Sequence, residues 1–419
     1  MTDALREAWW AHLAGVRWFG GKGAAASLTA LEPLGWYTAP GVVPAVRSEV
    51  ATITYDDGRV EHYHLLAAYR PGRGDGPLGR ADLDDLGACA VSDATTEPDA
   101  LAAFVAGLAA RPGEHYRPLA RLAGLDEAEV SLLGGEQSNT TLCVGPDALL
   151  KLFRKVEPGP NLDAEVLQAL AGDAVPVLYG RLLGAWPAGA TTDRGMLVAR
   201  VPGARDGWDV ATAACAAGRD FSAEAAALGV ALREVHARLR EAFPTGTRTG
   251  DDLAAAMTAR LERALTEAPV LAGHAPAIAG ALSALRGRTF ATQRVHGDFH
   301  LGQTLVSPAG WTIIDFEGEP AKTAAERREP DSVWRDVAGM LRSFDYARSA
   351  HADPASAEAV AWASGARSAF LAGYTGGEPT DGSVLRAYEL DKAAYEVVYE
   401  LRNRPDWVGI PLRAIRETG

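Results

Sequence analysis

The sequence has few cysteines and lacks long apolar runs. Its three cysteines, Cys89, Cys143 and Cys215, lie far apart. Their spacing excludes a disulfide framework and a paired-cysteine zinc site, and it is typical of a reducing compartment. The apolar stretches are short and interrupted by Arg, Asp or Glu, so none predicts a membrane-spanning helix. We therefore expect a cytoplasmic protein with no membrane partner.

Positive charge is also scarce, with 41 Lys and Arg against 54 Asp and Glu and a formal net charge of −13. This balance argues against nucleic acid as the main partner, because binding a phosphate backbone requires a basic surface. It says little against a small anion that binds at a local site. The opening MTDALRE is polar and amphipathic rather than signal-like. With 419 residues and no internal repeat, the chain is long enough for two or three domains.

Two neighbouring segments hold the most informative polar residues. The sequence RVHGDFHLGQTL contains Asp298 and, five residues later, Gln303. The sequence WTIIDFE places Asp315 twelve residues beyond Gln303, after an apolar run that predicts a short buried strand. A kinase centre has the same order: a catalytic aspartate, a metal-binding amide five residues later, and a second, metal-binding aspartate.

The chemistry of phosphoryl transfer explains these residue types, because it depends mainly on positioning and charge neutralisation. Asp298 suits the role of orienting the acceptor hydroxyl and taking its proton. Gln303 and Asp315 supply oxygen ligands that Mg²⁺ prefers. We expect His296 to tie the loop to the core, whereas His300 is a candidate for contact with the acceptor or with the groups around the metal. We interpret the segments as a magnesium-dependent phosphotransferase site. The alternative is a turn between a helix and a strand, in which Asp298 serves only as a capping residue.

Residues 130–144 predict a strand, a polar glycine-containing turn and a second strand. Backbone N–H groups there, together with the hydroxyls of Ser138, Thr140 and Thr141, form a candidate phosphate cradle. Ordinary hairpin-turn chemistry is the alternative explanation of the same residues.

Lys151 lies inside an otherwise apolar strand, ALLKLF. A buried lysine is costly unless it is paired or bound to an anion, so Lys151 is the candidate for holding nucleotide phosphates. Its expected partner is Glu165 on the following helix, with Asp163 and Glu157 ranked lower. The alternative is an edge-strand lysine that deters aggregation. Farther along, a strand breaks at Pro202-Gly203, which predicts a hinge between lobes.

Several motifs together resemble the actinobacterial maltokinases, of the aminoglycoside-phosphotransferase-like group with a eukaryotic-kinase-like fold. The similarity runs nearly from end to end. The motifs that carry it are VRWFGGKG (16–23), GEQSNT (135–140), LLKLFR (149–154), EPGPN (157–161), VHGDFHLGQ (295–303), DFEGEP (315–320) and YEVVYELRNRPDW (395–407).

The resemblance implies an α+β, bilobal, protein-kinase-like fold. It implies an N-terminal cap subdomain (1–90), a kinase N-lobe and intermediate subdomain (91–202) and a mainly helical C-lobe (203–419). Backbone groups of Ala199 and Val201 would then face adenine. The implied reaction transfers the γ-phosphoryl group of ATP, with Mg²⁺, to the C1 hydroxyl of maltose. The product, maltose 1-phosphate, feeds α-glucan (glycogen) synthesis. A trehalose synthase association occurs in some relatives, and we expect a monomer or a homodimer.

The acceptor site is predicted least sharply. A sugar pocket needs hydrogen-bonding side chains and an aromatic face, and the C-terminal helix supplies both. We place Tyr399, Glu400 and Arg404 at the sugar, together with His300. Two readings compete with a maltokinase. One is a related kinase for a small sugar or aminosugar, such as glucose, glucosamine or an aminoglycoside, favoured if Glu396 and Glu400 make the pocket acidic. The other is a catalytically silent kinase-fold binding protein.

Overall fold

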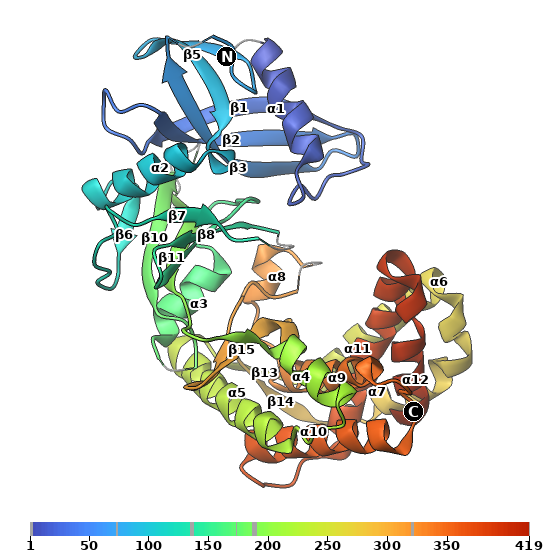
Figure 1. Cartoon of the computed structure of the whole chain (residues 1–419). Helices are drawn as coiled ribbons and strands as arrows, with labels where there is room; N and C mark the ends of the chain where they lie inside the picture. Colours follow the sequence, from blue (N-terminus) through green and yellow to red (C-terminus); the bar gives the residue numbers. More distant parts are fainter. Residues whose placement is uncertain are drawn as a thin grey trace. The chain divides into compact units, whose positions relative to one another are not determined.

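The computed structural model describes residues 3–72, 74–134, 138–172, 174–186, 191–319 and 322–418. The chain separates into two compact units, and Figure 1 labels most of their helices and strands. Unit 1 comprises Met1–Gln168 and Val177–Arg200, and unit 2 comprises Ala169–Pro176 and Val201–Gly419. The division between Arg200 and Val201 lies just before Pro202-Gly203, where we expected the hinge.

Unit 1 begins with helix α1 and a five-stranded antiparallel sheet of order β1-β2-β3-β5-β4. A short turn at residues 56–58 joins β2 to β3, and Thr54 pairs with Val60 beside it. Leu5, Trp9 and Leu13 of α1 are buried in the core of this sheet. The bounds are α1 (Asp3–Gly15), β1 (Ala26–Trp36), β2 (Ala45–Tyr55), β3 (Val60–Pro71), β4 (Arg80–Leu83) and β5 (Gly87–Asp93).

A second antiparallel sheet in unit 1 has the order β6-β10-β11-β9-β8-β7. Helix α2 contributes Phe104 and Leu108 to a core shared with strands of both sheets, so it packs between them. The bounds are α2 (Pro98–Ala110), β6 (Tyr116–Pro118), β7 (Val130–Leu132), β8 (Thr140–Val144), β9 (Ala148–Leu152), α3 (Leu162–Leu170), β10 (Leu178–Ala185) and β11 (Thr191–Ala199), with a short 3-10 helix η1 (Ala94–Thr96) before α2.

Backbone hydrogen bonds join the two sheets. The N–H of His64 donates to the carbonyl of Arg154 (2.7 Å), and the N–H of Val156 donates to the carbonyl of His62 (2.9 Å). Strand β3 therefore contacts the segment after β9 directly. The boundary that we expected near residue 90 falls inside β5, within one compact unit.

Unit 2 is mainly helical. Helix α5 carries Leu228, Leu232, Val235 and Leu239 at core spacing, and all four are fully buried. Burying one such side chain stabilises a fold by about 1.5–3 kcal/mol. The helices are α4 (Gly207–Ala216), α5 (Ser222–Ala242), α6 (Gly250–Glu267), α7 (Ala275–Ser283), α8 (Ala324–Arg328), α9 (Trp334–Ala347), α10 (Ala357–Thr375), α11 (Gly382–Asn403) and α12 (Gly409–Thr418), with the 3-10 helices η2 (Pro269–His274), η3 (Leu301–Gln303), η4 (Arg348–Ala350) and η5 (Pro405–Trp407).

Short strands in unit 2 hold the polar segments identified in the sequence. A three-stranded sheet has the order β12-β15-β16, and β13 pairs with β14. The segment with Asp298 follows β14, Gln303 directly precedes β15, and Asp315 follows β16. The bounds are β12 (Arg205–Asp206), β13 (Gly246–Thr249), β14 (Thr289–Thr292), β15 (Thr304–Ser307) and β16 (Gly310–Ile313).

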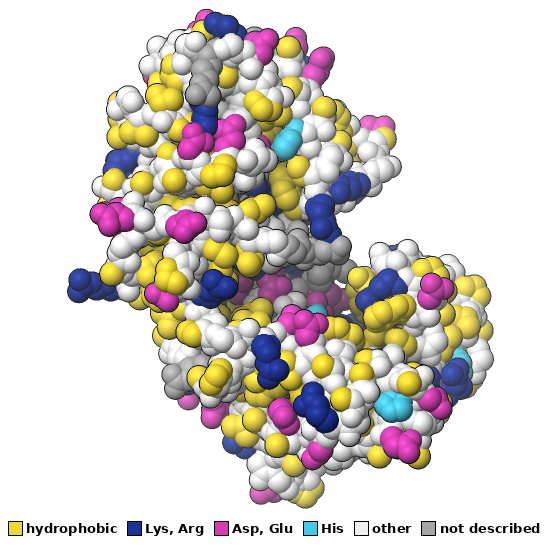
Figure 2. All heavy atoms as spheres, in the orientation of Figure 1, with side chains coloured by type: hydrophobic (Ala, Val, Ile, Leu, Met, Phe, Trp, Pro, Cys, Tyr) yellow, Lys and Arg dark blue, Asp and Glu magenta, His cyan; other side chains and the backbone are white. Residues whose placement is uncertain are grey.

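The surface mixes both signs of charge. On the face drawn in Figure 2, Lys and Arg alternate with Asp and Glu, and apolar side chains lie between them. Within the part of the chain that the structure describes, every helix is too short or too polar to cross a membrane.

Candidate active site

A buried carboxylate on helix α9 holds the backbone around Asp298. Asp336 accepts hydrogen bonds from the N–H groups of His296 (2.7 Å) and Gly297 (2.8 Å). Its Oδ2 also lies 2.9 Å from Nε2 of His236 on α5. Burial alone would raise the pKa of Asp336, but the hydrogen bonds and the charge of His236 outweigh it, and the pKa is lowered. Asp336 therefore stays ionised and fixes the loop.

Glycines allow this loop to lie close to its neighbours. Gly297 has a φ of 85°, and a Cβ there would lie 3.3 Å from the Cα of Gly318. A Cβ on Gly339 of α9 would lie 2.6 Å from the carbonyl oxygen of Phe299. Larger residues would push the backbone on either side of Asp298 away from its supports.

His296 has the structural role that we expected. The side chain is buried, and its Nε2 lies 2.9 Å from the carbonyl oxygen of Ile314, which follows β16. Its Nδ1 accepts a weak hydrogen bond from the N–H of Asp298 (3.4 Å). His296 therefore connects the Asp298 loop with the strand end that carries Asp315.

The two residues predicted to bind metal lie in neighbouring segments of unit 2. The N–H of Ile314 donates to the carbonyl of Gln303 (3.0 Å), which brings the end of η3 against the end of β16. Asp315 has a φ of 68°, a left-handed conformation that aspartate tolerates and that is frequent at functional sites. A carboxylate oxygen of Glu317 lies within 4.8 Å of one of Asp315. Amide and carboxylate oxygens form a donor set that fits Mg²⁺.

Two nitrogen groups flank the Asp298 carboxylate. Nζ of Lys392, on α11, lies 3.4 Å from Oδ1, and Nε2 of His300 lies 4.0 Å from Oδ2. Nδ1 of His300 accepts the N–H of Gly302 (3.1 Å), and desolvation by the surrounding protein lowers the pKa of His300. The neutral ring therefore carries its proton on Nε2, on the side of Asp298.

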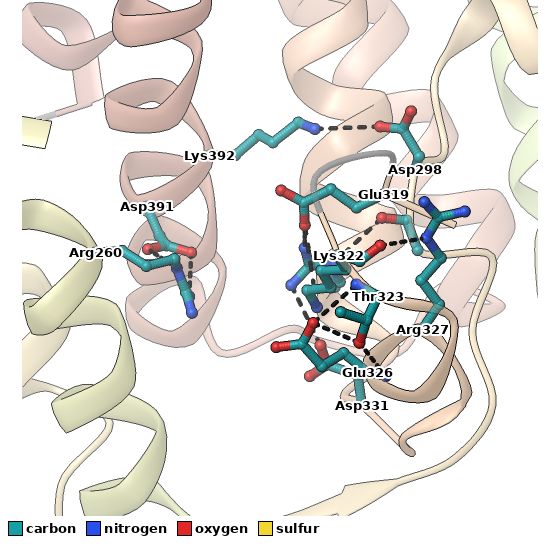
Figure 3. Close-up of polar contacts among 12 residues, drawn as sticks. Arg260, Asp298, Glu319, Lys322, Thr323, Glu326, Arg327, Asp331, Asp391 and Lys392 are labelled. Atoms are coloured by element: carbon teal, nitrogen blue, oxygen red, sulfur yellow. Dashed lines mark hydrogen bonds and ion pairs between the residues drawn. The ribbon is translucent and has the colours of Figure 1, made fainter. Parts of the chain in front are cut away.

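A cavity of about 670 Å³ opens beside Asp298 within unit 2. Several of its charged groups form ion pairs: Arg260 binds Asp391 through Nε (3.1 Å) and Nη2 (2.6 Å), and Arg335 binds Glu319. Figure 3 shows Lys392 extending from α11 toward Asp298 near these pairs. The polar and aromatic lining residues include Arg260, Asp298, Glu319, Lys322, Arg335, Tyr388, Asp391, Lys392 and Tyr395.

The residues that we assigned to the sugar form a cluster of their own. Glu400 is buried and accepts hydrogen bonds from Tyr346 (2.9 Å) and from Nε (2.9 Å) and Nη2 (2.7 Å) of Arg404. Tyr399 stacks on Tyr395, with 6.5 Å between ring centroids. The lining of the cavity includes Tyr395 but not these three residues. Glu400 therefore holds the end of α11, and a role of the cluster in acceptor binding stays a prediction.

Within unit 1, the structure gives Lys151 a partner other than the one expected. Lys151 lies on β9, and its Nζ is 3.0 Å from Oδ2 of Asp163, a buried residue in the first turn of α3. Asn161 caps this helix, because its Oδ1 accepts from the N–H groups of Asp163 (2.9 Å) and Ala164 (3.3 Å). The ion pair makes Asp163, which the sequence ranked below Glu165, a partner of Lys151. Contact of Glu165 with nucleotide stays a prediction.

The other nucleotide-site candidates differ in their surroundings. Thr140 is buried and its Oγ1 accepts from Nε of Arg154 (2.7 Å), so this hydroxyl stabilises a buried arginine. Ser138 is exposed, whereas Gly135–Gln137 of the same turn lie outside the described residues. The N–H of Ala199 donates to the carbonyl of Val177 (2.8 Å). Val201 begins the second segment of unit 2.

Sequence reasoning missed Asp336, Lys392 and Glu319. The role of Asp336 depends on contacts 39 and 40 residues back along the chain. Lys392 lies 94 residues from Asp298. The usable signal was its position: a lysine one turn before Tyr395, on the helix already assigned to the acceptor.

A carboxylate on a fixed loop, followed by oxygen donors that fit a divalent cation, suits phosphoryl transfer to a hydroxyl. Together with a sheet-rich first unit and a helical second unit, it defines the class of the protein as a kinase-like phosphotransferase. The chain belongs to the phosphotransferase enzyme family, whose sequence model matches residues 129–371. The matched span contains Lys151, Asp298 and Asp315, and it ends before α11.

Two curated relatives extend the comparison. A glucosamine kinase from Streptacidiphilus jiangxiensis is 31% identical over 317 residues, which are 66% of this chain and 70% of that protein. A glucosamine kinase from Mycolicibacterium smegmatis (strain ATCC 700084 / mc(2)155) is 28% identical over 324 residues, which are 67% of this chain and 77% of that protein.

Solved structures agree with the fold. A glucosamine kinase in complex with glucosamine, ADP and inorganic phosphate gives a TM-score of 0.65 at 24% identity, over 98% of each chain. A second structure of a glucosamine kinase, in crystal form B, gives 0.67 at 23% identity, over 98% of this chain and 99% of that one. The predicted α+β, kinase-like fold is therefore confirmed.

Proposed function

We propose that the chain is an ATP- and Mg²⁺-dependent kinase that phosphorylates a hydroxyl group of an amino sugar, with glucosamine as the first candidate. The observation that carries this proposal is the cavity beside Asp298, in which Glu319 and Asp391 supply carboxylates for a cationic acceptor. The two curated relatives named above, both glucosamine kinases, support the same choice of acceptor.

Glu319 is the stronger candidate for binding the ammonium group. Both cations that contact it reach the same oxygen: Arg335 binds Oε2, and Lys322 lies 4.0 Å from Oε2. Asp391, in contrast, is engaged by both nitrogens of the Arg260 fork. Oε1 of Glu319 is therefore the better placed acceptor for an added N–H donor, which would make a charge-assisted hydrogen bond.

The proposed reaction uses residues in distinct roles. Asp298 accepts a hydrogen bond from the acceptor hydroxyl and takes its proton as the hydroxyl oxygen attacks the γ-phosphorus of ATP. The bond to the β-phosphate oxygen breaks, and ADP leaves with that electron pair. Bound Mg²⁺ would neutralise phosphate charge, and Gln303, Asp315 and Glu317 would hold it. Lys151, kept in place by Asp163, is proposed to bind nucleotide phosphates.

Maltose is the second candidate acceptor, with phosphorylation at C1 for α-glucan synthesis. It is supported by the maltokinase-like motifs near both ends of the chain and by a cavity volume of about 670 Å³, within the usual range for small-molecule sites. The proposed association with trehalose synthase belongs to this second candidate. A monomer or a homodimer is expected for either acceptor.

A coupled ADP-release assay with ATP and Mg²⁺ tests the proposal. Glucosamine is compared with glucose, N-acetylglucosamine and maltose, and the Asp298→Asn variant gives the background. Glucose and N-acetylglucosamine retain the ring but lack the cation. We expect kcat/KM for glucosamine to exceed theirs by about 10–100-fold, the worth of one hydrogen bond to a charged group. Preference for maltose, with phosphate on C1 by NMR, would replace the first candidate with the second.

A further inference from the structure

We propose that Lys392 is a positioning residue for the catalytic base: its ammonium group holds Oδ1 of Asp298 and leaves Oδ2 for the acceptor hydroxyl. This inference rests on the proposed function in one respect, the role of Asp298 as the base. Lys392 lies on α11, outside the span that the family model matches.

The side chain of Lys392 is fixed at two points. Its Nζ lies 3.4 Å from Oδ1 of Asp298 and 5.3 Å from the ring centroid of Tyr395, within cation–π range. Both neighbours line the same cavity. Figure 3 shows the lysine crossing from α11 to the Asp298 loop. The ammonium group therefore has a defined place beside the base.

The surrounding charges favour a charged Lys392. Burial alone would lower its pKa, but the carboxylates of Asp298 and Glu396 outweigh that effect, and the pKa of Lys392 is raised. Glu396 is itself held by Nε (2.9 Å) and Nη2 (2.8 Å) of Arg342. Asp298 is thus the carboxylate that Lys392 contacts directly, while Glu396 and Glu319 act on it through space.

The loop does not need Lys392 for its shape. Asp336 already binds the N–H groups of His296 and Gly297, and His296 binds the carbonyl of Ile314. The carboxylate of Asp298 is less constrained, because the terminal torsion of aspartate has a broad minimum and His300 is 4.0 Å away. Lys392 therefore acts on the orientation of the carboxylate rather than on the backbone.

The cation also has an electrostatic effect on the reaction. The transferred phosphoryl group is negative, and it must approach the hydroxyl that Asp298 binds. An ammonium group 3.4 Å from the base offsets the charge of the carboxylate at that point. Removing it should slow the chemical step more than it weakens binding of ATP.

Kinetics of Lys392→Met test the proposal, with Lys155→Met as the matched control. Lys155 also pairs with a carboxylate, Glu61 at 2.7 Å, but on the surface of unit 1. We expect kcat of Lys392→Met to fall about 10–100-fold, the worth of one charge-assisted hydrogen bond, with KM for ATP within about threefold of wild type. Lys155→Met should match wild type. A kcat of Lys392→Met within about twofold of wild type would overturn the proposal.

Chemical rescue separates positioning from a fold defect. In Lys392→Ala, ethylammonium should restore part of kcat because it brings an N–H donor to Oδ1, whereas tetramethylammonium, which has no N–H, should not. Equal effects of the two ions would count against the proposal. Lys392→Arg, which retains a cation with N–H donors, should keep more activity than Lys392→Met.

An NMR comparison gives a readout that needs no turnover, so it stands even if no tested sugar is a substrate. The ¹³C carboxylate signal of Asp298 is assigned by its loss in Asp298→Asn. Because Lys392→Met removes the ammonium group that lies 3.4 Å from Oδ1, the ¹³C chemical shift of the Asp298 carboxylate should change. An unchanged carboxylate signal in Lys392→Met would refute the contact with Lys392.

Discussion

Replacement of Asp336 by Asn should weaken unit 2 and slow catalysis together. The carboxylate accepts three hydrogen bonds, at Oδ2 from His236 and His296 and at Oδ1 from Gly297. An amide keeps one oxygen and turns an NH₂ group toward at least one donor. Each lost bond to a charged group costs about 1.5–3 kcal/mol, so the free energy of unfolding should fall by about 3–5 kcal/mol. For a unit of this size, that corresponds to a drop in Tm of about 10 °C.

The pH dependence of the same variant supplies a second check. A carboxyl group whose pKa is lower in the folded than in the unfolded state stabilises the fold above its unfolded pKa, and this contribution is lost as the pH falls through the folded pKa. The difference in Tm between Asp336→Asn and wild type should therefore narrow below about pH 4.

Calorimetry and the ADP-release assay measure both effects. Because the loop carrying Asp298 would shift, kcat should fall by up to about 100-fold. Asp57→Asn is a suitable control, since Asp57 is exposed and pairs locally with Arg59. A variant at Asp336 with wild-type Tm and wild-type kcat would refute the assignment of this carboxylate as the support of the loop.

Three further predictions follow from the candidate site. Asp298→Asn should abolish turnover while titration calorimetry still detects ATP binding; loss of ATP binding as well would show that Asp298 serves the metal. Asp315→Ala should weaken nucleotide binding in Mg²⁺ by about tenfold or more and leave binding in EDTA unchanged, and equal losses in both would exclude a metal role. Glu319→Gln should raise KM for glucosamine by about tenfold and leave KM for glucose unchanged; a parallel rise for both sugars would place the ammonium elsewhere.

Local spacing explains what could be predicted from the sequence. Asp298, Gln303 and Asp315 lie within one short stretch of the sequence, so their order alone was enough to propose a role for each of them. The core positions of α5 lie three or four residues apart, so they share one face of the helix. The buried role of His296 was likewise inferred from its place beside the base.

The sequence does not fix where helix α3 begins, and the start of this helix determines which of its side chains faces Lys151. Asp163 and Glu165 are two residues apart, so their side chains leave α3 in nearly opposite directions. The cap at Asn161 sets the start of the helix, and it turns Asp163 toward β9. If the helix began one residue earlier or later, a different side chain of α3 would face Lys151.

The cavity beside Asp298 could not be predicted because it is assembled from segments far apart in the chain. Its lining comes from α6, α7, α8, α9 and α11, from residues 297–299, and from Glu319 and Lys322. Tyr399 lies on the same stripe of α11 as Lys392 and Tyr395, but the stripe extends beyond the cavity. Helical periodicity identifies the face of α11 and does not fix which turn meets the acceptor.

Helix α11 has two faces that should differ in their tolerance of substitution. Glu389 and Glu396 bind the arginines Arg367 and Arg342 in the interior, and breaking one buried pair costs about 3–5 kcal/mol. These pairs anchor the helix independently of Lys392 and Tyr395, which line the cavity beside Asp298. We therefore expect substitutions on the cavity-lining face to reshape the cavity at little cost to the fold, whereas substitutions on the anchored face should destabilise the helix.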